Sequence, residues 1–446
     1  MSSQAVVGAA EPMQRPPSRS RVSEAAGYEA GAGPGLACRS CGATDLDLVV
    51  DLGDQPPAER FIPASELSTP DRRLPLRIRV CRTCWLVQLE GDPVASADEP
   101  AGLAFSISPT MRTHVEGLVA DAIERLGDHQ NARVLELASH GNRLHDFFAA
   151  GGLRSELVEP IAVHAASARD AGVPVIEGHL TPDVARRLVA DGGPADLVVD
   201  AFHLAHEADP GEWADGLGAV LAPTGVAIVE FDHLRPIIDE TQYDGFRHGH
   251  ASYLSLTAFS ALLRRAGLAA VDARPTPAYG GSLRVTVAHE GARAAAAGPQ
   301  GVARVNATLE AERTDGLADP ATYRRFADRV EVAREGLRSF FHSASAEGRT
   351  VAGYGAPSRG NTLLNSSGIG SAELPFVVDR AASKHGQYLP GSRIPIRPPA
   401  ALDELRPDYV LILTWDLADE IVSQLPAVRS WGGRFVVPLP AVRVLD

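Results

Sequence analysis

The four cysteines of the chain stand in two Cys-x-x-Cys pairs, Cys38 with Cys41 and Cys81 with Cys84. Each pair aims two thiolates at one point, and two such pairs complete the tetrahedron of a closed zinc site. Four sulfur ligands leave no position for water or substrate, so we expect a structural zinc ion. Disulfides are the alternative, but a cytosolic chain without a thioredoxin-like βαβ pattern disfavours them.

A second group with chemical potential lies between Glu240 and Thr257, where Arg247, His248 and His250 stand close together. An imidazole titrates near neutral pH and can remove a proton that is held within hydrogen-bond reach. Spacing alone does not decide the matter, because histidines this close together also occur on loops without a catalytic role.

Near the C-terminus an apolar run beginning at Val351 opens through Gly353, Gly355 and Gly360 into a predicted helix. Glycines allow a tight turn, and the helix behind them offers a positive dipole end, so the pattern predicts a site for a phosphate-bearing ligand. Asp379 closes the next apolar strand at about the distance of a ribose-binding acid, which makes NAD a rival ligand. The glycine spacing departs from the dinucleotide fingerprint.

Several segments around this turn resemble the C-terminal domain of the deoxysugar C-methyltransferases, which methylate a carbon of a nucleotide-linked 4-ketosugar. They are Val351–Asn365, Tyr388–Ile396, Pro407–Trp415 and Trp431–Pro438. Asp51–Phe61, between the two cysteine pairs, resembles the linker of the zinc-binding N-terminal domain of the same family. The resemblance spans nearly everything after residue 36.

The resemblance implies that Gly353, Tyr354, Gly355, Asn361 and Asp379 line the nucleotide-sugar side of the substrate site. It also covers Tyr279–Arg284, close to the family's usual His-Gly-Gly-Ser-Leu-Arg. Ser282 and Arg284 in that segment either face a sugar or phosphate or merely complete a hairpin.

The stretch from Glu136 to Asn142 stands where class I methyltransferases bind S-adenosylmethionine, and Glu159 stands where an acid would take the ribose hydroxyls. The family usually reads Glu-Ile-Gly-Ser-Asn-Asp-Gly here, whereas Ala138 replaces the first glycine and Gly141 the aspartate. A side chain at a close backbone approach can cost on the order of 1 to 3 kcal/mol. Cofactor binding by Glu136, Ala138, Gly141 and Glu159 is therefore an open expectation.

The histidine segment resembles the family's Tyr-His-Glu-His pattern, with Arg247 in place of the tyrosine and Gly249 in place of the glutamate. The resemblance implies that His250 is the base that forms an enolate beside the ketone, while Arg247 could supply positive charge. The resemblance implies S-adenosylmethionine-dependent C-methylation of the ketosugar in natural-product biosynthesis. The departures from the family pattern leave two alternatives open. The alternatives are a family member that catalyses epimerisation or another enolate rearrangement, and a non-enzymatic partner.

Short apolar runs alternate with helical stretches from Ala132 to about Ala288, which predicts a doubly wound α/β domain. Buried parallel strands are expected at 134–137, 155–158, 196–199 and 226–229, and an edge strand at 283–287. The overall expectation is α/β. Residues 1–35 form a disordered tail, 36–98 a small zinc-knuckle domain, 99–290 a Rossmann-like class I methyltransferase domain, and 291–446 a Rossmann-like nucleotide-sugar-binding domain.

The amino-acid composition argues against two classes of partner, nucleic acids and membranes. The net charge is -14, and Lys384 is the only lysine, which argues against binding nucleic acid. No apolar stretch near 20 residues and no N-terminal signal pattern are found, so we expect a cytoplasmic enzyme without a membrane partner. The sugar, the carbon attacked and the oligomeric state do not follow from the sequence.

Overall fold

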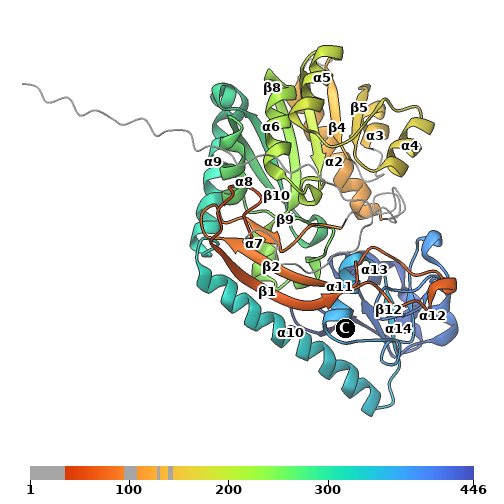
Figure 1. Ribbon diagram of the computed structural model, residues 1–446. Coiled ribbons are helices and arrows are strands. Elements are labelled where there is room, and N and C mark those ends of the chain that lie inside the picture. Colours follow the sequence, from red (N-terminus) through yellow and green to blue (C-terminus); the bar gives the residue numbers. More distant parts are fainter. Residues whose placement is uncertain (1–35, 95–107, 128–130, 139–143, 446) are drawn as a thin grey trace, which may run out of the picture.

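The computed structural model describes residues 36–94, 108–127, 131–138 and 144–445. The tail expected over residues 1–35 lies outside these residues. Three sheets organise the rest, with four, seven and six strands in chain order. Figure 1 shows strands β1 and β2 of the first sheet lying between the two larger α/β units. The expected α/β class with a small N-terminal domain and two Rossmann-like units is confirmed.

The seven-stranded sheet has the strand order β10-β11-β8-β7-β4-β5-β6. Its strands are β4 (Val134–Leu137), β5 (Ser155–Glu159), β6 (Val175–Glu177), β7 (Ala195–Ala201), β8 (Leu221–Asp232), β10 (Leu268–Thr276) and β11 (Ser282–His289). Strands β4 to β8 are parallel, and β11 runs antiparallel to β8. The edge position expected for residues 283–287 is wrong, because β10, which the apolar pattern did not reveal, pairs with β11 on its outer side.

Helices connect these strands, and several of them begin at a side-chain cap. They are α2 (Pro109–Leu126), α3 (Leu144–Ala150), α4 (Ala162–Asp170), α5 (Pro182–Gly192), α6 (Pro210–Val220), α7 (Leu234–Asp239), α8 (Leu256–Arg265) and α9 (Arg293–Thr314). The side chains of Ser108, Thr181 and Asp209 accept backbone N–H groups in the first turns of α2, α5 and α6. A proline follows each cap, where its missing N–H costs nothing.

The four-stranded sheet contains β1 (Leu46–Gln55), β2 (Leu74–Cys81), β3 (Val87–Leu89) and β9 (Ser252–Tyr253), in that order. Strand β9 comes from the histidine segment, far along the chain, and pairs antiparallel with β3. The N-terminal sheet is thus completed by the segment that carries the candidate base.

The C-terminal sheet has the order β14-β13-β12-β15-β16-β17. Its strands are β12 (Val351–Tyr354), β13 (Val377–Val378), β14 (Ile396–Arg397), β15 (Tyr409–Ile412), β16 (Arg434–Val437) and β17 (Arg443–Leu445). The helices are α10 (Pro320–Ala346), which leads into the sheet, and α11 (Ser358–Ser366), α12 (Ala400–Leu405), α13 (Ala418–Gln424) and α14 (Pro426–Ser430). All strands but β17 run parallel.

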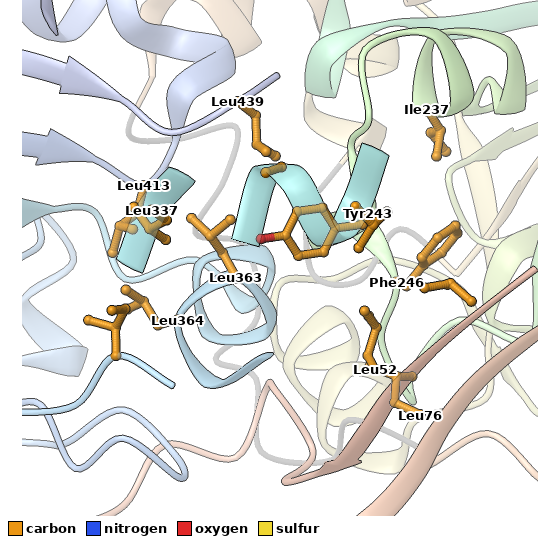
Figure 2. Close-up of a cluster of buried hydrophobic side chains, with 14 of the residues drawn as sticks. Leu52, Leu76, Ile237, Tyr243, Phe246, Leu337, Leu363, Leu364, Leu413 and Leu439 are labelled. Atoms are coloured by element: carbon orange, nitrogen blue, oxygen red, sulfur yellow. The ribbon is translucent and has the colours of Figure 1, made fainter. Parts of the chain in front are cut away.

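One hydrophobic core joins the first sheet to the C-terminal unit. Leu52 and Leu76 of the first sheet belong to the same buried cluster as Tyr243, Leu337 and Leu363, and Figure 2 shows side chains of this cluster. Because apolar side chains of both are buried in one cluster, the first sheet and the C-terminal unit are expected to keep a fixed arrangement. Among the helices that the structure describes, none combines the length and hydropathy that a membrane crossing needs.

Candidate active site between the two Rossmann-like units

The four cysteines form one compact cluster. Their sulfur atoms all lie within 4.8 Å of one another, and the Sγ atoms of Cys38 and Cys84, like those of Cys41 and Cys81, are 3.5 Å apart. These separations are too long for disulfides, whose sulfurs are about 2.05 Å apart. They match the edge of a tetrahedron with bonds of about 2.3 Å to zinc. The predicted four-thiolate zinc site is confirmed.

The four-stranded sheet, which carries two of the cysteines next to β3, holds the histidine segment from one side. Besides the pairing of β3 with β9, the N–H of Leu89 donates to the carbonyl of Ala251 at 3.0 Å, and the N–H of Val94 donates to the carbonyl of His248 at 2.8 Å. Backbone bonds on both sides of His250 therefore tie its position to the zinc domain.

A cavity of about 330 Å³ lies where the carboxyl ends of the two parallel sheets face each other. From the seven-stranded unit it is lined by Ala201, Phe202, Asp232, Arg247, His250 and Tyr279. From the six-stranded unit it is lined by Tyr354, Gly355, Arg359, Asp379, Lys384 and Asp416. Ligands of open α/β sheets bind at this end of the strands, so the cavity is the candidate substrate site.

His250 is 4% exposed and lines this cavity. Its ring lies edge-on to that of His206, with centroids 4.5 Å apart, and tilted against that of Tyr253 at 5.7 Å. These contacts hold the imidazole in the cavity wall, a prerequisite for proton transfer at a defined atom.

Arg247 also lines the cavity, and its Nε lies 2.9 Å from Oε1 of Glu59. Glu59, which sequence reasoning missed, is 5% exposed and comes from the linker between the cysteine pairs. In the sequence, Glu59 is just one of the acidic residues in the linker Asp51–Phe61, and nothing there indicates a place in the active site.

His248 points elsewhere. Its Nε2 lies 3.2 Å from the carbonyl oxygen of Leu74 in β2, and it is not among the residues that line the cavity. Burial lowers the pKa of His248, which favours the neutral imidazole. The structure therefore places His250 and Arg247 together at the cavity and His248 behind it.

Asp232, at the end of β8, is a second residue that the sequence did not single out. It lines the cavity, its Oδ1 has no hydrogen-bond partner among the described residues, and burial raises its pKa. A buried oxygen of this kind is available to a ligand donor such as a hydroxyl. The sequence signal that could have identified Asp232 is its place as an acidic residue close to the end of a predicted parallel strand.

On the C-terminal side, Tyr354, Gly355 and Asp379 line the cavity, as expected for substrate residues. Gly355 has a φ of +89°, which favours glycine, and Asp379 accepts the N–H groups of Ala356 and Ala381 at 2.7 Å each. Gly353 does not line the cavity. A Cβ there would lie 2.6 Å from Cγ1 of Val377, so the glycine allows two strands to pack.

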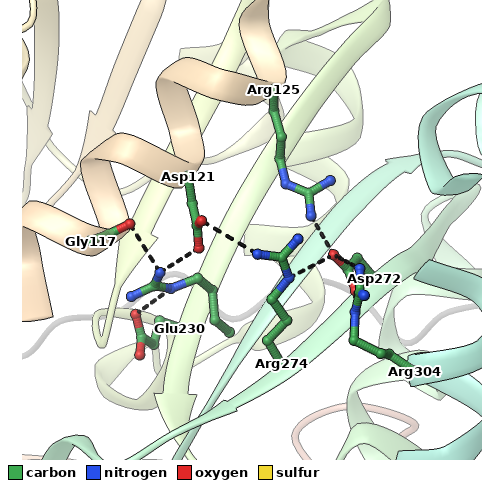
Figure 3. A network of polar contacts seen from close by, with 8 residues as sticks. Gly117, Asp121, Arg125, Glu230, Asp272, Arg274 and Arg304 are labelled. Carbon is green, nitrogen blue, oxygen red and sulfur yellow. Dashed lines mark hydrogen bonds and ion pairs between the residues drawn. The ribbon is translucent and has the colours of Figure 1, made fainter. Parts of the chain in front are cut away.

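Asn361, Ser282 and Arg284 are engaged away from the cavity. Nδ2 of Asn361 donates to the carbonyl of Ala58 at 2.6 Å, and the hydroxyl of Ser282 donates to the carbonyl of Ala278 at 2.8 Å. Arg284 pairs with Glu230 at 3.1 Å and with Asp121 at 2.6 Å. Both acids belong to the charged network that Figure 3 shows. The hairpin alternative fits Ser282 and Arg284 better than ligand contact.

The expected cofactor residues lie at neighbouring strand ends. Glu136 on β4 is fully buried, contacts the hydroxyl of Ser155, and has its pKa raised to about 8 by burial. Glu159 closes β5, accepts the N–H of Ile161 at 3.0 Å through Oε1, and has no partner for Oε2 among the described residues. Ala138 has a φ of +34°, a glycine-like conformation that costs an alanine energy. Gly141 lies outside the described residues.

Three family models match the chain in succession. They are a zinc-binding domain over residues 38–96, a methyltransferase domain over residues 111–273, and a C-methyltransferase C-terminal domain over residues 277–440.

One relative covers almost the whole chain. C-methyltransferase NovU of Streptomyces niveus is 36% identical over 412 residues, which make up 92% of this chain and 96% of NovU. Among solved structures, PH0226 of Pyrococcus horikoshii OT3 is 16% identical over 41% of this chain and 92% of its own, with a TM-score of 0.34. A likeness this low does not contribute to the assignment. From the family models and NovU, the chain belongs to the C-methyltransferase family, as its sequence resemblance predicts.

Proposed function

We propose that this C-methyltransferase uses S-adenosylmethionine to methylate a carbon beside the ketone of a nucleotide-linked 4-keto-deoxysugar through an enolate. The observation that carries the proposal is the shared cavity. His250 from one Rossmann-like unit and Gly355 and Asp379 from the other line the same space. Such a cavity fits a ligand whose nucleotide contacts the C-terminal unit while its acidic C–H bond faces His250 of the other unit.

The residues at the ends of β4 and β5 fit the methyl donor. Glu159 Oε2 is a buried acceptor without a partner among the described residues, suited to a ribose hydroxyl, and Ala138 has a positive φ of +34°, a backbone conformation that favours glycine. Glu136, Ala138 and Glu159 would hold S-adenosylmethionine. When bound, it supplies an electrophilic methyl group.

The chain's own residues would carry the proton and the charge. His250 would take the proton from the carbon next to the ketone, because its imidazole is held in the cavity wall. Arg247 would stabilise the negative charge that develops on the ketone oxygen. Asp232 would accept a hydrogen bond from a sugar hydroxyl through its unpartnered oxygen.

A product assay tests the proposal. Purified protein is incubated with nucleotide-linked ketosugars in deuterated water, with and without S-adenosylmethionine, and the products are weighed by mass spectrometry. A product that gains one methyl supports the proposal. Deuterium uptake without a gain of methyl would favour the alternative, an enolate rearrangement. If the product shows neither deuterium nor a methyl group, both the methylation and the rearrangement are contradicted.

A further inference from the structure

The carboxylate of Glu59 lies beside Gly249, where a side chain at position 249 would contact it. A Cβ built on Gly249 would lie 3.3 Å from Oε1 of Glu59 and 3.5 Å from its Cδ. In the family pattern a glutamate stands at position 249, so this chain has a carboxylate in the same neighbourhood from a different segment. The carboxylate is buried with Arg247, whose side chain is 18% exposed while that of Glu59 is 6% exposed.

Contacts with the C-terminal unit fix the segment that carries Glu59. The carbonyl of Ala58, the preceding residue, accepts the bond from Asn361. Ile62 exchanges two backbone hydrogen bonds with Tyr388, at 2.9 and 2.8 Å. A carboxylate held from both ends in this way is preorganised toward Arg247, which lowers the cost of orienting the guanidinium.

We propose that Glu59 of the zinc-binding domain is a positioning residue of the active site, which holds Arg247 in the cavity wall and replaces the carboxylate that Gly249 lacks. This inference rests on the proposed function. The ion pair between the Nε of Arg247 and Glu59 keeps the charge of Arg247 directed toward the reacting oxygen. A side chain at position 249 would be in tight contact with the Glu59 carboxylate, which would have to shift by a few tenths of an ångström.

The test moves the carboxylate from position 59 to position 249. Glu59→Ala should lower kcat for enolate formation about 100-fold, with a smaller change in KM, because Arg247 loses its fixed orientation. Gly249→Glu alone should also lower kcat, because two carboxylates then compete for one place. The double variant Glu59→Ala/Gly249→Glu should recover at least about tenfold over Glu59→Ala alone.

The matched control is Glu66→Ala, which removes an acid of the same domain that pairs with Arg60 at 2.8 Å on the surface. Its kcat should stay at the wild-type value. Thermal midpoints of all variants separate loss of fold from loss of positioning. Should Glu59→Ala not fold, the comparison of Glu59→Gln with Glu59→Gln/Gly249→Glu takes its place.

Each outcome decides. Recovery in the double variant supports the inference. Wild-type kcat in folded Glu59→Ala, or no recovery in the double variant, overturns it and leaves the proposed function standing if the wild type methylates. A wild-type protein that neither exchanges deuterium nor methylates overturns both.

Discussion

Arg359 of α11 donates two hydrogen bonds to the carboxylate of Asp244, which lies in the histidine segment. Its Nε is 3.0 Å from Oδ2 and its Nη2 is 3.2 Å from Oδ1. The two residues belong to different Rossmann-like units; the side chain of Asp244 is fully buried and that of Arg359 is 12% exposed. The indole of Trp415 adds a bond to the same carboxylate at 2.8 Å and lies under the guanidinium. The pair therefore fixes the two walls of the cavity relative to each other.

Arg359→Ala should reduce the free energy of unfolding by about 3 to 5 kcal/mol, because it leaves the buried Asp244 carboxylate without its charged partner. Urea denaturation followed by fluorescence measures the change. Arg313→Ala, which removes an exposed ion pair with Glu310, serves as the control and should leave the midpoint unchanged. Equal midpoints for both variants would contradict the role of this pair.

The stability of the protein should depend on pH through His203 and Glu207. Burial disfavours the charged imidazole, but Glu207 at 2.6 Å outweighs it and raises the pKa of His203 to about 9. The stabilisation from this raised pKa is therefore complete below about pH 6.5 and is lost as the pH rises through 9.

His203→Gln should thus be less stable than wild type by on the order of 2 to 3 kcal/mol at pH 6, and the gap should narrow at pH 9.5. Glu207, whose pKa is lowered to about 2, stays ionised at both pH values. Denaturation curves of both proteins at the two pH values provide the check. A gap that does not change with pH would show that the charge of His203 is not what stabilises the fold.

Zinc removal should lower the rate of methylation although the sulfur atoms do not line the cavity. The metal closes the turn next to β3, which pairs with β9 beside His250. Chelation is expected to lower activity at least about tenfold, and added zinc should restore it. Full activity in a protein shown by elemental analysis to lack zinc would refute this link.

Ala138→Gly should tighten binding of S-adenosylmethionine by about tenfold, because it removes a Cβ from a backbone with a φ of +34°. Calorimetric titration of both proteins gives the ratio. As a control, Ala122→Gly in the middle of α2 should lower stability by about 1 kcal/mol or more without affecting affinity. Weaker binding by Ala138→Gly would mean that the cofactor loop needs the alanine.

Local patterns in the sequence were sufficient for the zinc centre and the parallel strands. Two Cys-x-x-Cys pairs have one geometry that satisfies all four thiolates, and the buried run Val134–Leu137 has few alternatives to a central strand. Strand β10 was missed because it carries Asp272 and Arg274, whose charges interrupt the apolar pattern and are paired in space with Arg304 and Asp121.

The candidate site was only partly predictable because its neighbours come from distant parts of the chain. His248 and His250 are equivalent by spacing, and only the pairing of β9 with β3 turns one toward the cavity and the other toward Leu74. Asn361 looked like a ligand contact, but its amide holds Ala58, 303 residues away. Glu59 meets Arg247 and Gly249 only in the folded chain.

The most direct test of the central claim is the rate of deuterium uptake at the carbon beside the ketone, measured for His250→Gln and His248→Gln against wild type. The account predicts a loss of at least about 100-fold for His250→Gln, because the imidazole proposed as the base is lost, and a change within a few-fold for folded His248→Gln. Wild-type exchange by His250→Gln would contradict it.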